Sequence, residues 1–495
     1  MIKKSLFAFS SGLIFSLGFA PFDLWMVSIL SVAILSSLLK GLSKKESFLI
    51  GYIYGLGMWL TGISWLYVSI HYHGNISQIG SAILILFFVA ILALYSGILL
   101  LLNKFLESGT SKALLFLTLP TSWVLIEILR SYLFTGFPWL ISGTMLADTL
   151  ADGFTPIIGA QGNTFLIVLM GSLVYQIYYK FNKKKSALLP AILLGFLVIS
   201  SFVFKSIEWT TLNKEIKVSL FQPNLTLEDK WSQRGIIKTH NMIEKAIDDA
   251  EDRELILFPE TALILSEKDN KSFIDSINYK SSKKNLTLIT GIVEREDENR
   301  IKNRLITLGS VNTHYDKIKL VPFGEFIPLK SYLGGFLDII GLNLTDTIPG
   351  SDVNQINTGE YTISPSICYE IAFDNFVRKT AKDSNLLLTV SNDTWFGQSF
   401  GPIQHLEIAQ NRALEHKKPL IRATNSGISA FISRDGKIIE KQDYFEEKKL
   451  SRKLNLYSGS TFYAKYGNLP IIILIMFYLG LIIIKSFFLR NKYYI

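Results

Sequence analysis

The chain has 495 residues, of which 49% are hydrophobic and 18% charged, and its mean hydropathy is +0.31. The hydrophobic fraction and the hydropathy are high, and the charged fraction is low, for a soluble globular protein, and the length allows two or more domains. The net charge of +9 does not indicate a nucleic-acid partner, because much of the excess lysine and arginine lies in short links between apolar segments, where it orients helices.

Long apolar segments fill the first 205 residues and return near the C-terminus. About 20 residues are needed for one helical crossing of a bilayer. We predict eight membrane-spanning helices, near residues 5–20, 24–39, 47–70, 80–102, 113–134, 157–179, 186–204 and 468–485. Lys3 and Lys4 before the first segment are also typical of a cleaved signal peptide. Against this alternative, Pro21 follows the candidate cleavage site and a further hydrophobic segment begins at once.

The basic residues divide the short links between these segments into two sets. Lysine is found in the links near 40–45, 104–112 and 180–185, and in both terminal segments. Neither lysine nor arginine is found in the links near 20–24, 70–79 and 135–156. Because basic links stay in the cytoplasm, we predict that the N-terminus is inside and that residues 215–455 are outside the cytoplasm.

Two charged residues, Glu127 and Arg130, fall within the fifth apolar segment, one helical turn apart. Charges inside a membrane are costly and often functional, and pairing at this interval reduces the cost. The sequence leaves a structural ion pair and a substrate role open.

Residues 215–455 alternate β-branched runs with helical stretches, which favours an α/β domain whose sheets are covered by helices. Strands are predicted at 216–221, 255–258, 286–292, 304–308, 363–367, 386–390, 420–423 and 428–432, and helices near 232–250, 270–282, 370–382 and 402–416. The predicted domains are a seven-helix bundle (1–207), a globular domain (208–462), and a last helix with its tail (463–495).

Two polar residues with catalytic potential follow strand ends in this domain. Glu260 follows the run Leu257-Phe258-Pro259, where burial would raise its pKa and make it a better proton acceptor. Lys317 precedes an apolar turn at 321–324 and is suited to stabilising an oxyanion. Taken singly, the glutamate also suits a helix N-terminus and the lysine a solvated surface.

Cys368 is the only cysteine of the chain and lies where a β-rich run gives way to a helical stretch. Such a junction exposes a side chain and favours a thiolate, although a lone cysteine is often a small buried hydrophobic residue. One glutamate, one lysine and one cysteine at strand ends of one domain together predict covalent acyl chemistry. The glutamate takes the thiol proton, the thiolate attacks a carbonyl, and the lysine assists the developing charge.

These residues resemble the nitrilase superfamily and, with eight apolar segments, the apolipoprotein N-acyltransferases within it. The most specific stretches are Leu320-Val321-Pro322-Phe323-Gly324-Glu325, Cys368-Tyr369-Glu370 and Ser391-Asn392-Asp393-Thr394-Trp395-Phe396-Gly397. The resemblance implies a polytopic helical bundle joined to a nitrilase-like α-β-β-α sandwich. Thr394 stands where alanine is more usual, and Pro365 implies an edge or irregular position in the strand before the cysteine.

The resemblance also assigns roles to individual residues. It implies that Glu260 is the general base, Lys317 the triad lysine and Cys368 the nucleophile, with Lys319 a nearby competitor for the lysine role. Supporting positions implied in the same way are Glu325, which would organise the triad, Tyr369 and Glu370 beside the nucleophile, Trp231 on a mobile loop near a lipid entrance, and Trp395 around the site.

The reaction implied by the resemblance is the last step of bacterial lipoprotein maturation. An acyl chain passes from a phospholipid, commonly phosphatidylethanolamine, to the cysteine as a thioester, and then to the N-terminal amine of a diacylglyceryl apolipoprotein. No metal or cofactor is implied. The enzyme would be a monomer in the inner membrane with its catalytic domain on the periplasmic side. Two alternatives are a membrane-tethered amidase or nitrilase with a small soluble substrate, and a transporter with an exported binding domain.

Overall fold

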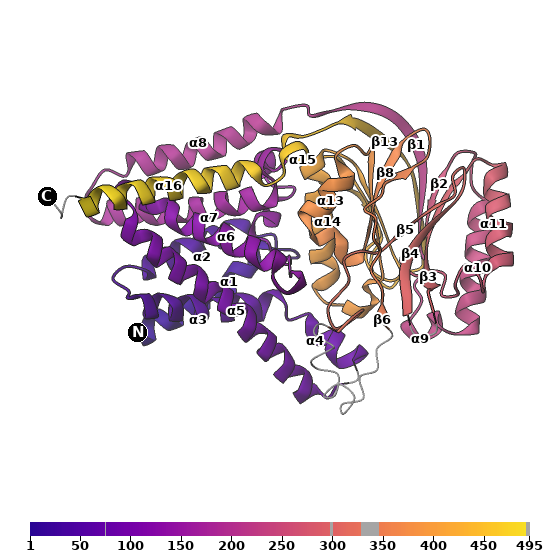
Figure 1. Cartoon of the computed structure of the whole chain (residues 1–495), viewed down its shortest axis with the longest axis horizontal. Coiled ribbons are helices and arrows are strands. Elements are labelled where there is room, and N and C mark those ends of the chain that lie inside the picture. Colours follow the sequence, from indigo (N-terminus) through magenta and orange to yellow (C-terminus); the bar gives the residue numbers. More distant parts are fainter. Residues whose placement is uncertain (75, 298–299, 328–345, 492–495) are drawn as a thin grey trace. The chain divides into compact units, whose positions relative to one another are not determined.

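The computed structural model describes residues 1–74, 76–297, 300–327 and 346–491 (Figure 1). The chain forms two compact units. The first unit contains Met1–Glu208, Ser399–Glu407 and Phe462–Ile495, and the second contains Trp209–Gln398 and Ile408–Thr461. Each unit is therefore assembled from segments that are far apart in the sequence.

The first unit is helical. Its main helices are α1 (Ile2–Phe15), α2 (Trp25–Leu38), α3 (Lys44–Gly62), α4 (Leu66–Val68), α5 (Gln78–Gly109), α6 (Thr118–Tyr132), α7 (Thr155–Asn182), α8 (Leu188–Lys205), α15 (Phe462–Tyr466) and α16 (Leu469–Asn491). Glycines allow close helix packing: a Cβ on Gly12 of α1 would lie 2.0 Å from the carbonyl oxygen of Tyr54 in α3.

Four helical segments of the described chain are long and apolar enough to cross a membrane. They are Gln78–Gly109, Lys112–Thr135, Asp152–Asn182 and Leu188–Lys205, and a fifth is obtained if Lys44–Gly62 and Leu66–His73, bent by 65°, form one span. These helices support a membrane domain. The eight predicted crossings stay a prediction, because α1 and α2 have only 14 residues each. That length is about 21 Å, less than the ~30 Å of a hydrocarbon core.

The second unit contains two β-sheets. In the described residues one sheet is seven-stranded, in the order β13-β1-β2-β3-β4-β5 with β6 beside β4, and the other is six-stranded, in the order β12-β11-β10-β9-β8-β7. The strands are β1 (Thr210–Gln222), β2 (Leu255–Leu257), β3 (Thr287–Arg295), β4 (Arg300–Gly309), β5 (Thr313–Asp316), β6 (Asp346–Thr347), β7 (Ile356–Asn357), β8 (Thr362–Ile367), β9 (Leu386–Ser391), β10 (Leu420–Thr424), β11 (Ala430–Ile432), β12 (Ile438–Lys441) and β13 (Lys448–Gly459).

Helices cover the outer faces of both sheets. Helices α10 (Gln233–Asp248) and α11 (Lys271–Lys283) lie against the first sheet, and α13 (Asp374–Ala381) and α14 (Gly401–His416) lie on the side of the second (Figure 1). Strand β2 is apolar and buried along its whole length, as expected for a strand between two parallel neighbours in a covered sheet. The layer order is α-β-β-α.

All eight predicted strands correspond to strands of the structure, and the predicted globular helices correspond to α10, α11, α13 and α14. Strand β13 was not predicted, because Lys448–Gly459 is rich in lysine and contains no β-branched residue. It nevertheless pairs along β1 from Thr210↔Gly459 to Gln222↔Lys448. The expectation for Pro365 agrees with the pairing. Short β7 pairs with β8 at Thr362 and Ile363, before the proline is reached.

Candidate active site

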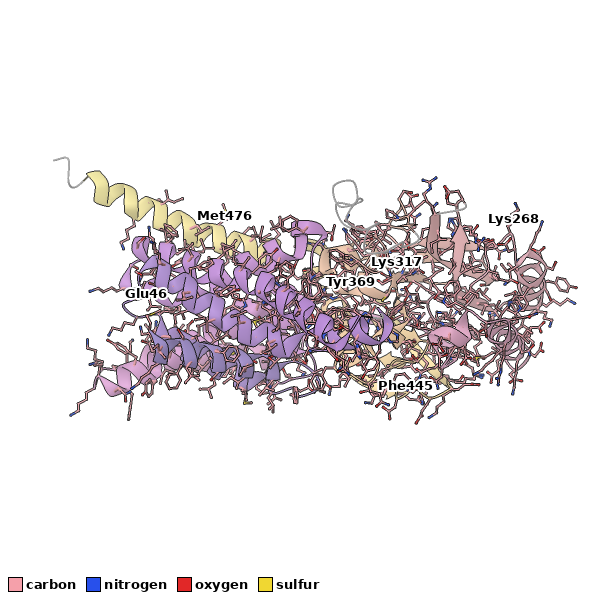
Figure 2. The ribbon with its side chains drawn as sticks, turned by 90° about the horizontal axis from the view of Figure 1, so that it is seen from below. Glu46, Lys268, Lys317, Tyr369, Phe445 and Met476 are labelled. Carbon is pink, nitrogen blue, oxygen red and sulfur yellow. The ribbon has the colours of Figure 1, made fainter. Side chains whose placement is uncertain are left out.

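The glutamate, lysine and cysteine singled out from the sequence come together in the second unit. Glu260 follows β2, Lys317 follows β5, and Cys368 follows β8. The Nζ atom of Lys317 lies 3.2 Å from Oε1 of Glu260 and 2.8 Å from Oε1 of Glu325, and the lysine is only 2% exposed. Figure 2 marks Lys317 and Tyr369, the residue after the cysteine, within this unit.

Cys368 occupies a sharp turn directly after its strand. Its φ angle is +52°, in the left-handed region that non-glycine residues rarely adopt. Such conformations are held by surrounding structure and cluster at functional sites. The turn leaves the cysteine partly exposed, while the next two residues, Tyr369 and Glu370, are buried.

The surroundings of the sulfur keep it protonated at rest. Burial raises the pKa of the Cys368 thiol, the Glu260 carboxylate raises it further, and Lys317 opposes both effects. Since the thiolate is the nucleophile, the site needs a base that takes the proton as the reaction proceeds. Glu260 is a charged neighbour suited to that role.

Lys317 stays protonated although it is buried. Burial alone would lower its pKa, but the carboxylates of Glu260 and Glu325 outweigh that cost and hold its pKa well above the ordinary value. A permanent ammonium group beside the thiol is suited to stabilising an oxyanion formed on an attacked carbonyl.

Both carboxylate oxygens of Glu260 are held by hydrogen bonds. Oε1 accepts from Nδ2 of Asn303 at 2.7 Å as well as from Lys317, and Oε2 accepts from the backbone N–H of Asn392 at 2.7 Å. Sequence reasoning missed Asn303, which lies just outside the predicted strand 304–308. Asn392 belongs to the quoted Ser391–Gly397 stretch, but its contribution is a backbone group that side-chain patterns do not reveal.

Glu325 fixes the turn that precedes it. Its Oε2 accepts the backbone N–H of Val321 at 2.7 Å while Oε1 receives Lys317. Between them, Phe323 has φ +62° and is 69% exposed. The apolar turn at 321–324 that the sequence predicts therefore points the Glu325 carboxylate toward Lys317 and the Phe323 ring toward solvent.

Glu370 joins the lysine segment to the cysteine segment. Its Oε1 accepts the backbone N–H groups of Ile318 (2.7 Å) and Lys319 (3.1 Å), and its Oε2 accepts Ile367 N–H (2.7 Å) and the Tyr315 hydroxyl (2.9 Å). Burial raises the pKa of Glu370 to about 7, although the three backbone donors act to lower it. One buried carboxylate thus holds the segment around Lys317, the proposed lysine, at a fixed distance from the segment around Cys368, the proposed nucleophile.

The remaining predicted site residues are three aromatic residues and the second lysine. Tyr369 packs edge-on against Phe373, and Trp231 and Trp395 are exposed by 58% and 47%. Lys319, the competitor for the lysine role, places its Nζ over the Phe373 ring at 5.4 Å from the ring centroid.

Lys230 was not predicted. It is buried directly before Trp231 and donates from Nζ to the carbonyl oxygen of Glu260 at 3.1 Å and to the Thr261 hydroxyl. Burial lowers its pKa to about 8, against the opposing effect of Glu260. It fastens the segment that carries Trp231 to the peptide of the glutamate.

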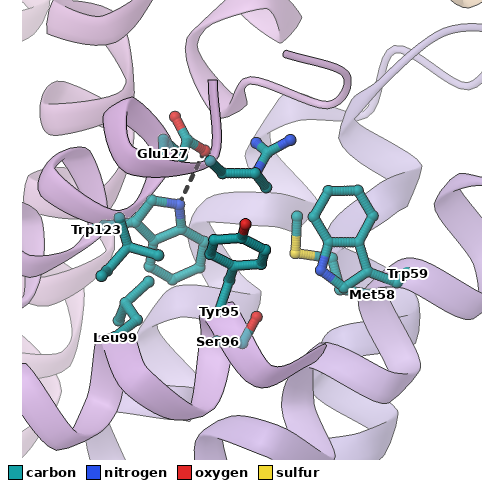
Figure 3. A pocket seen from close by; sticks show the side chains of 9 residues that line it. Met58, Trp59, Tyr95, Ser96, Leu99, Trp123 and Glu127 are labelled. Atoms are coloured by element: carbon teal, nitrogen blue, oxygen red, sulfur yellow. Dashed lines mark hydrogen bonds between the residues drawn. The ribbon is translucent and has the colours of Figure 1, made fainter. Parts of the chain in front are cut away.

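A separate small cavity lies inside the first unit, between helices α3, α5 and α6 (Figure 3). Its volume is about 20 Å³, room for one water molecule. Glu127 beside it accepts hydrogen bonds from Trp123, Ser142 and Thr164, while Arg130 donates to the carbonyl oxygens of residues 137, 139 and 140. Both charges thus bind polar groups of the helical unit itself.

The two-sheet sandwich with these three groups at its strand ends defines a carbon-nitrogen hydrolase domain, and residues 217–459 match the family described as Carbon-nitrogen hydrolase. Residues 11–173 match the family described as Apolipoprotein N-acyltransferase N-terminal domain. Across the described ranges, no group of three or more His, Cys, Asp or Glu residues is arranged to hold a metal ion.

Relatives match nearly the whole chain. An apolipoprotein N-acyltransferase of Photobacterium profundum is 34% identical over 95% of this chain and 94% of its own length. One of Vibrio parahaemolyticus is 35% identical over 99% of this chain and 98% of its own length. Saccharomyces cerevisiae Nit3, a solved nitrilase-superfamily structure, is 17% identical, covers 49% of this chain and 91% of its own, and has a TM-score of 0.38. The chain belongs to the apolipoprotein N-acyltransferase family.

Proposed function

We propose that this chain moves a fatty acyl group from a phospholipid, through Cys368, to the N-terminal amine of a diacylglyceryl-cysteine apolipoprotein. The observation that supports this most is the buried contact of Lys317 with Glu260 and Glu325 beside a partly exposed Cys368, in a chain of the N-acyltransferase family. Phosphatidylethanolamine is the proposed donor, and the enzyme is proposed to act as a monomer without metal or cofactor.

In the first half-reaction Glu260 takes the proton of the Cys368 thiol, and the sulfur attacks an ester carbonyl of the phospholipid. Lys317 stabilises the oxyanion of the tetrahedral intermediate. The carbon–oxygen ester bond then breaks, and the leaving lysophospholipid oxygen takes the proton back from Glu260. The products are a Cys368 thioester and a lysophospholipid, with Glu260 again ionised.

In the second half-reaction the amine of the apolipoprotein attacks the thioester carbonyl. Glu260 takes one amine proton, the carbon–sulfur bond breaks, and the sulfur leaves as a thiolate that is reprotonated through Glu260. The product is an amide, and the free enzyme is restored. The charge that Lys317 must stabilise is the same in both half-reactions, so one site is sufficient for the two steps.

The membrane arrangement is part of the same proposal. We propose eight crossings, with a bundle over 1–207, a catalytic domain over 208–462 and an anchor over 463–495. The lysine distribution between links supports a catalytic domain on the periplasmic side of the inner membrane. One membrane helix would be enough to hold a hydrolase-like domain at a membrane. A whole helical bundle is explained if both substrates, the phospholipid and the apolipoprotein, are themselves embedded in lipid.

The proposal is tested with purified full-length protein, phosphatidylethanolamine carrying a labelled acyl chain, and a synthetic diacylglyceryl-cysteine peptide. The labelled chain should appear on the peptide as an amide that resists alkaline hydroxylamine. Release of the label to water as free fatty acid, with or without peptide, would favour the membrane-tethered hydrolase instead. Cys368→Ala is the control and should form neither product.

A further inference from the structure

A serine hydroxyl lies beside the cysteine on the neighbouring strand. Strands β8 and β9 are parallel, with Ile367 paired to Val390. The next residues, Cys368 after Ile367 and Ser391 after Val390, are therefore neighbours. Ser391 is fully buried, and its hydroxyl is hydrogen-bonded to the Cys368 sulfur. None of the roles assigned above to Glu260, Lys317 and Glu325 uses this contact.

The same hydroxyl is held from its other side by a buried ion pair. Ser391 Oγ donates to Oδ1 of Asp393 at 2.5 Å, and Oδ2 of Asp393 accepts from Nη2 of Arg422 at 2.5 Å. The side chains of Asp393 and Arg422 are both 0% exposed. Arg422 is itself fixed through Nε to the carbonyl oxygen of Ile428 at 3.2 Å. A continuous chain of contacts therefore runs from the sulfur through Ser391 and Asp393 to Arg422.

A buried ion pair is weak evidence for stability, because taking two charges out of water costs about as much as their attraction returns. Its position next to the Cys368 sulfur, with Ser391 between them, fits a task other than stability. Asp393 alone would disfavour a thiolate, since its negative charge raises the pKa of Cys368. With Arg422 bound to the same carboxylate, the pair is close to neutral, and its effect is to orient the Ser391 hydroxyl.

We propose that Ser391, oriented by Asp393 and Arg422, is a positioning residue that donates its hydroxyl hydrogen bond to the Cys368 sulfur whenever that sulfur is an anion. This inference rests on Cys368 being the nucleophile of the proposed function. Ser391 has one proton to donate. It points to Asp393 while the sulfur is a thiol or a thioester, and it turns to the sulfur when a thiolate forms. The thiolate then gains a charge-assisted hydrogen bond, while Asp393, which loses the serine, keeps its ion pair with Arg422.

The sulfur is anionic twice in the cycle, once as the attacking group and once as the leaving group. A hydroxyl that stabilises the anion therefore assists both half-reactions without taking part in proton transfer. The charged groups that act on the sulfur in the structure are Glu260, Lys317 and Asp393. Removing the Ser391 hydroxyl changes none of these charges, so its effect can be measured separately from theirs.

Loss of one hydrogen bond to a charged group should raise the pKa of the sulfur by about one pH unit. At any pH below the titration midpoint, this makes the thiolate about tenfold rarer. The chain has a single cysteine, so full-length protein alkylated by iodoacetamide in detergent is digested, and the modified fraction of the fragment that contains Cys368 is measured by mass spectrometry. Alkylation of amines at high pH is assigned to other sites by fragmentation.

The test compares alkylation rates between pH 6 and pH 11 in the absence of substrate. Ser391→Ala should be alkylated about tenfold more slowly than wild type at each pH below the midpoint, with its curve displaced to higher pH. Ser391→Thr keeps the hydroxyl and should restore the wild-type curve. Because alanine is smaller than serine, a change in access to the sulfur would speed alkylation of Ser391→Ala, which is opposite to the expected result.

Ser364→Ala is the matched control. Ser364 is a buried strand serine of β8 whose hydroxyl is bonded to that of Thr380, and its alkylation curve should equal that of wild type. Ser391→Gly also removes the hydroxyl and is used if the alanine variant does not fold. A wild-type curve in Ser391→Ala or Ser391→Gly would overturn the inference, even if acyl transfer is slower. Failure of the proposed function would appear elsewhere, as acyl transfer that survives Cys368→Ala.

Discussion

Replacing Glu370 by glutamine should slow acyl transfer but, at alkaline pH, should not lower the stability of the folded protein. The carboxylate accepts four hydrogen bonds, two at each oxygen. A glutamine keeps one acceptor oxygen and turns an NH₂ group toward the other pair of donors. At least one backbone N–H then lacks an acceptor, which costs about 1–3 kcal/mol. It also loosens the spacing between the Lys317 and Cys368 segments.

The opposing contribution comes from the buried charge. Burial raises the pKa of Glu370 from 4.5 to about 7, and one pH unit corresponds to about 1.4 kcal/mol. The folded state binds this proton more tightly than the unfolded state does. The stability it contributes is therefore complete below pH 4.5 and is lost as the pH rises through about 7. At pH 8 the ionised group costs about 3 kcal/mol, a cost that glutamine does not have.

Thermal unfolding of wild type and Glu370→Gln at pH 5 and pH 8 measures this difference. The melting temperature of the variant relative to wild type should be roughly 5–10 °C higher at pH 8 than at pH 5, at about 2–4 °C per kcal/mol for a domain of this size. Acyl transfer by the variant should fall at least tenfold at both pH values. Glu228→Gln, a change at an exposed glutamate of α9 (Leu227–Lys230), should leave both quantities unchanged. A melting difference that is the same at both pH values would refute the reasoning.

Three further predictions concern the proposed catalytic groups. Lys317→Met should lower acyl transfer more than a thousandfold. Lys319→Met should stay within about threefold of wild type, because the contact it loses among the described residues is one with a ring, worth about 0.5–1 kcal/mol; the opposite ranking would reassign the lysine role. Asn303→Ala removes one hydrogen bond to Glu260 and should lower kcat/KM about 10–100-fold, and a loss below threefold would show that Lys317 and the Asn392 N–H hold the carboxylate unaided. Cys368→Ser should turn over at least a thousandfold more slowly, because a hydroxyl is hard to ionise, and a serine variant of near-normal rate would contradict thiolate chemistry.

The sequence was sufficient for eight strands of the globular domain and for three groups at strand ends. The short strands β5, β6, β7 and β12, of two to four residues each, and the longer β13 were not predicted. Largely apolar runs such as 255–258 and 386–390 are buried along their whole length. Each ends in a polar loop, so the pattern marks both the strand and the residue after it. Strand β13 gives a weaker signal, because it contains no β-branched residue and its leucines stand among lysine, serine and asparagine; its pairing with β1 identifies it as a strand.

The support around the candidate site could not be predicted, because it depends on contacts between distant segments. Glu370 meets Ile318 and Lys319 across 52 and 51 residues, and Asn392 donates to Glu260 across 132 residues through its backbone. Lys230 is another such case, since a lysine in a polar stretch gives no sign that folding will bury it against Glu260. For the membrane segments, the sequence located the apolar runs but not the lengths of the helices. Helices α1 and α2 are shorter than a full crossing requires.

Intact mass spectrometry of the wild-type protein, incubated with phosphatidylethanolamine and then with a diacylglyceryl-cysteine peptide, tests the covalent step most directly. After the first incubation the protein should gain the mass of one fatty acyl chain, on the peptide fragment that contains Cys368. After the second incubation it should return to its original mass as the acylated peptide appears. A protein that stays unmodified with lipid alone, yet still acylates the peptide when both substrates are present, would contradict the acyl-enzyme.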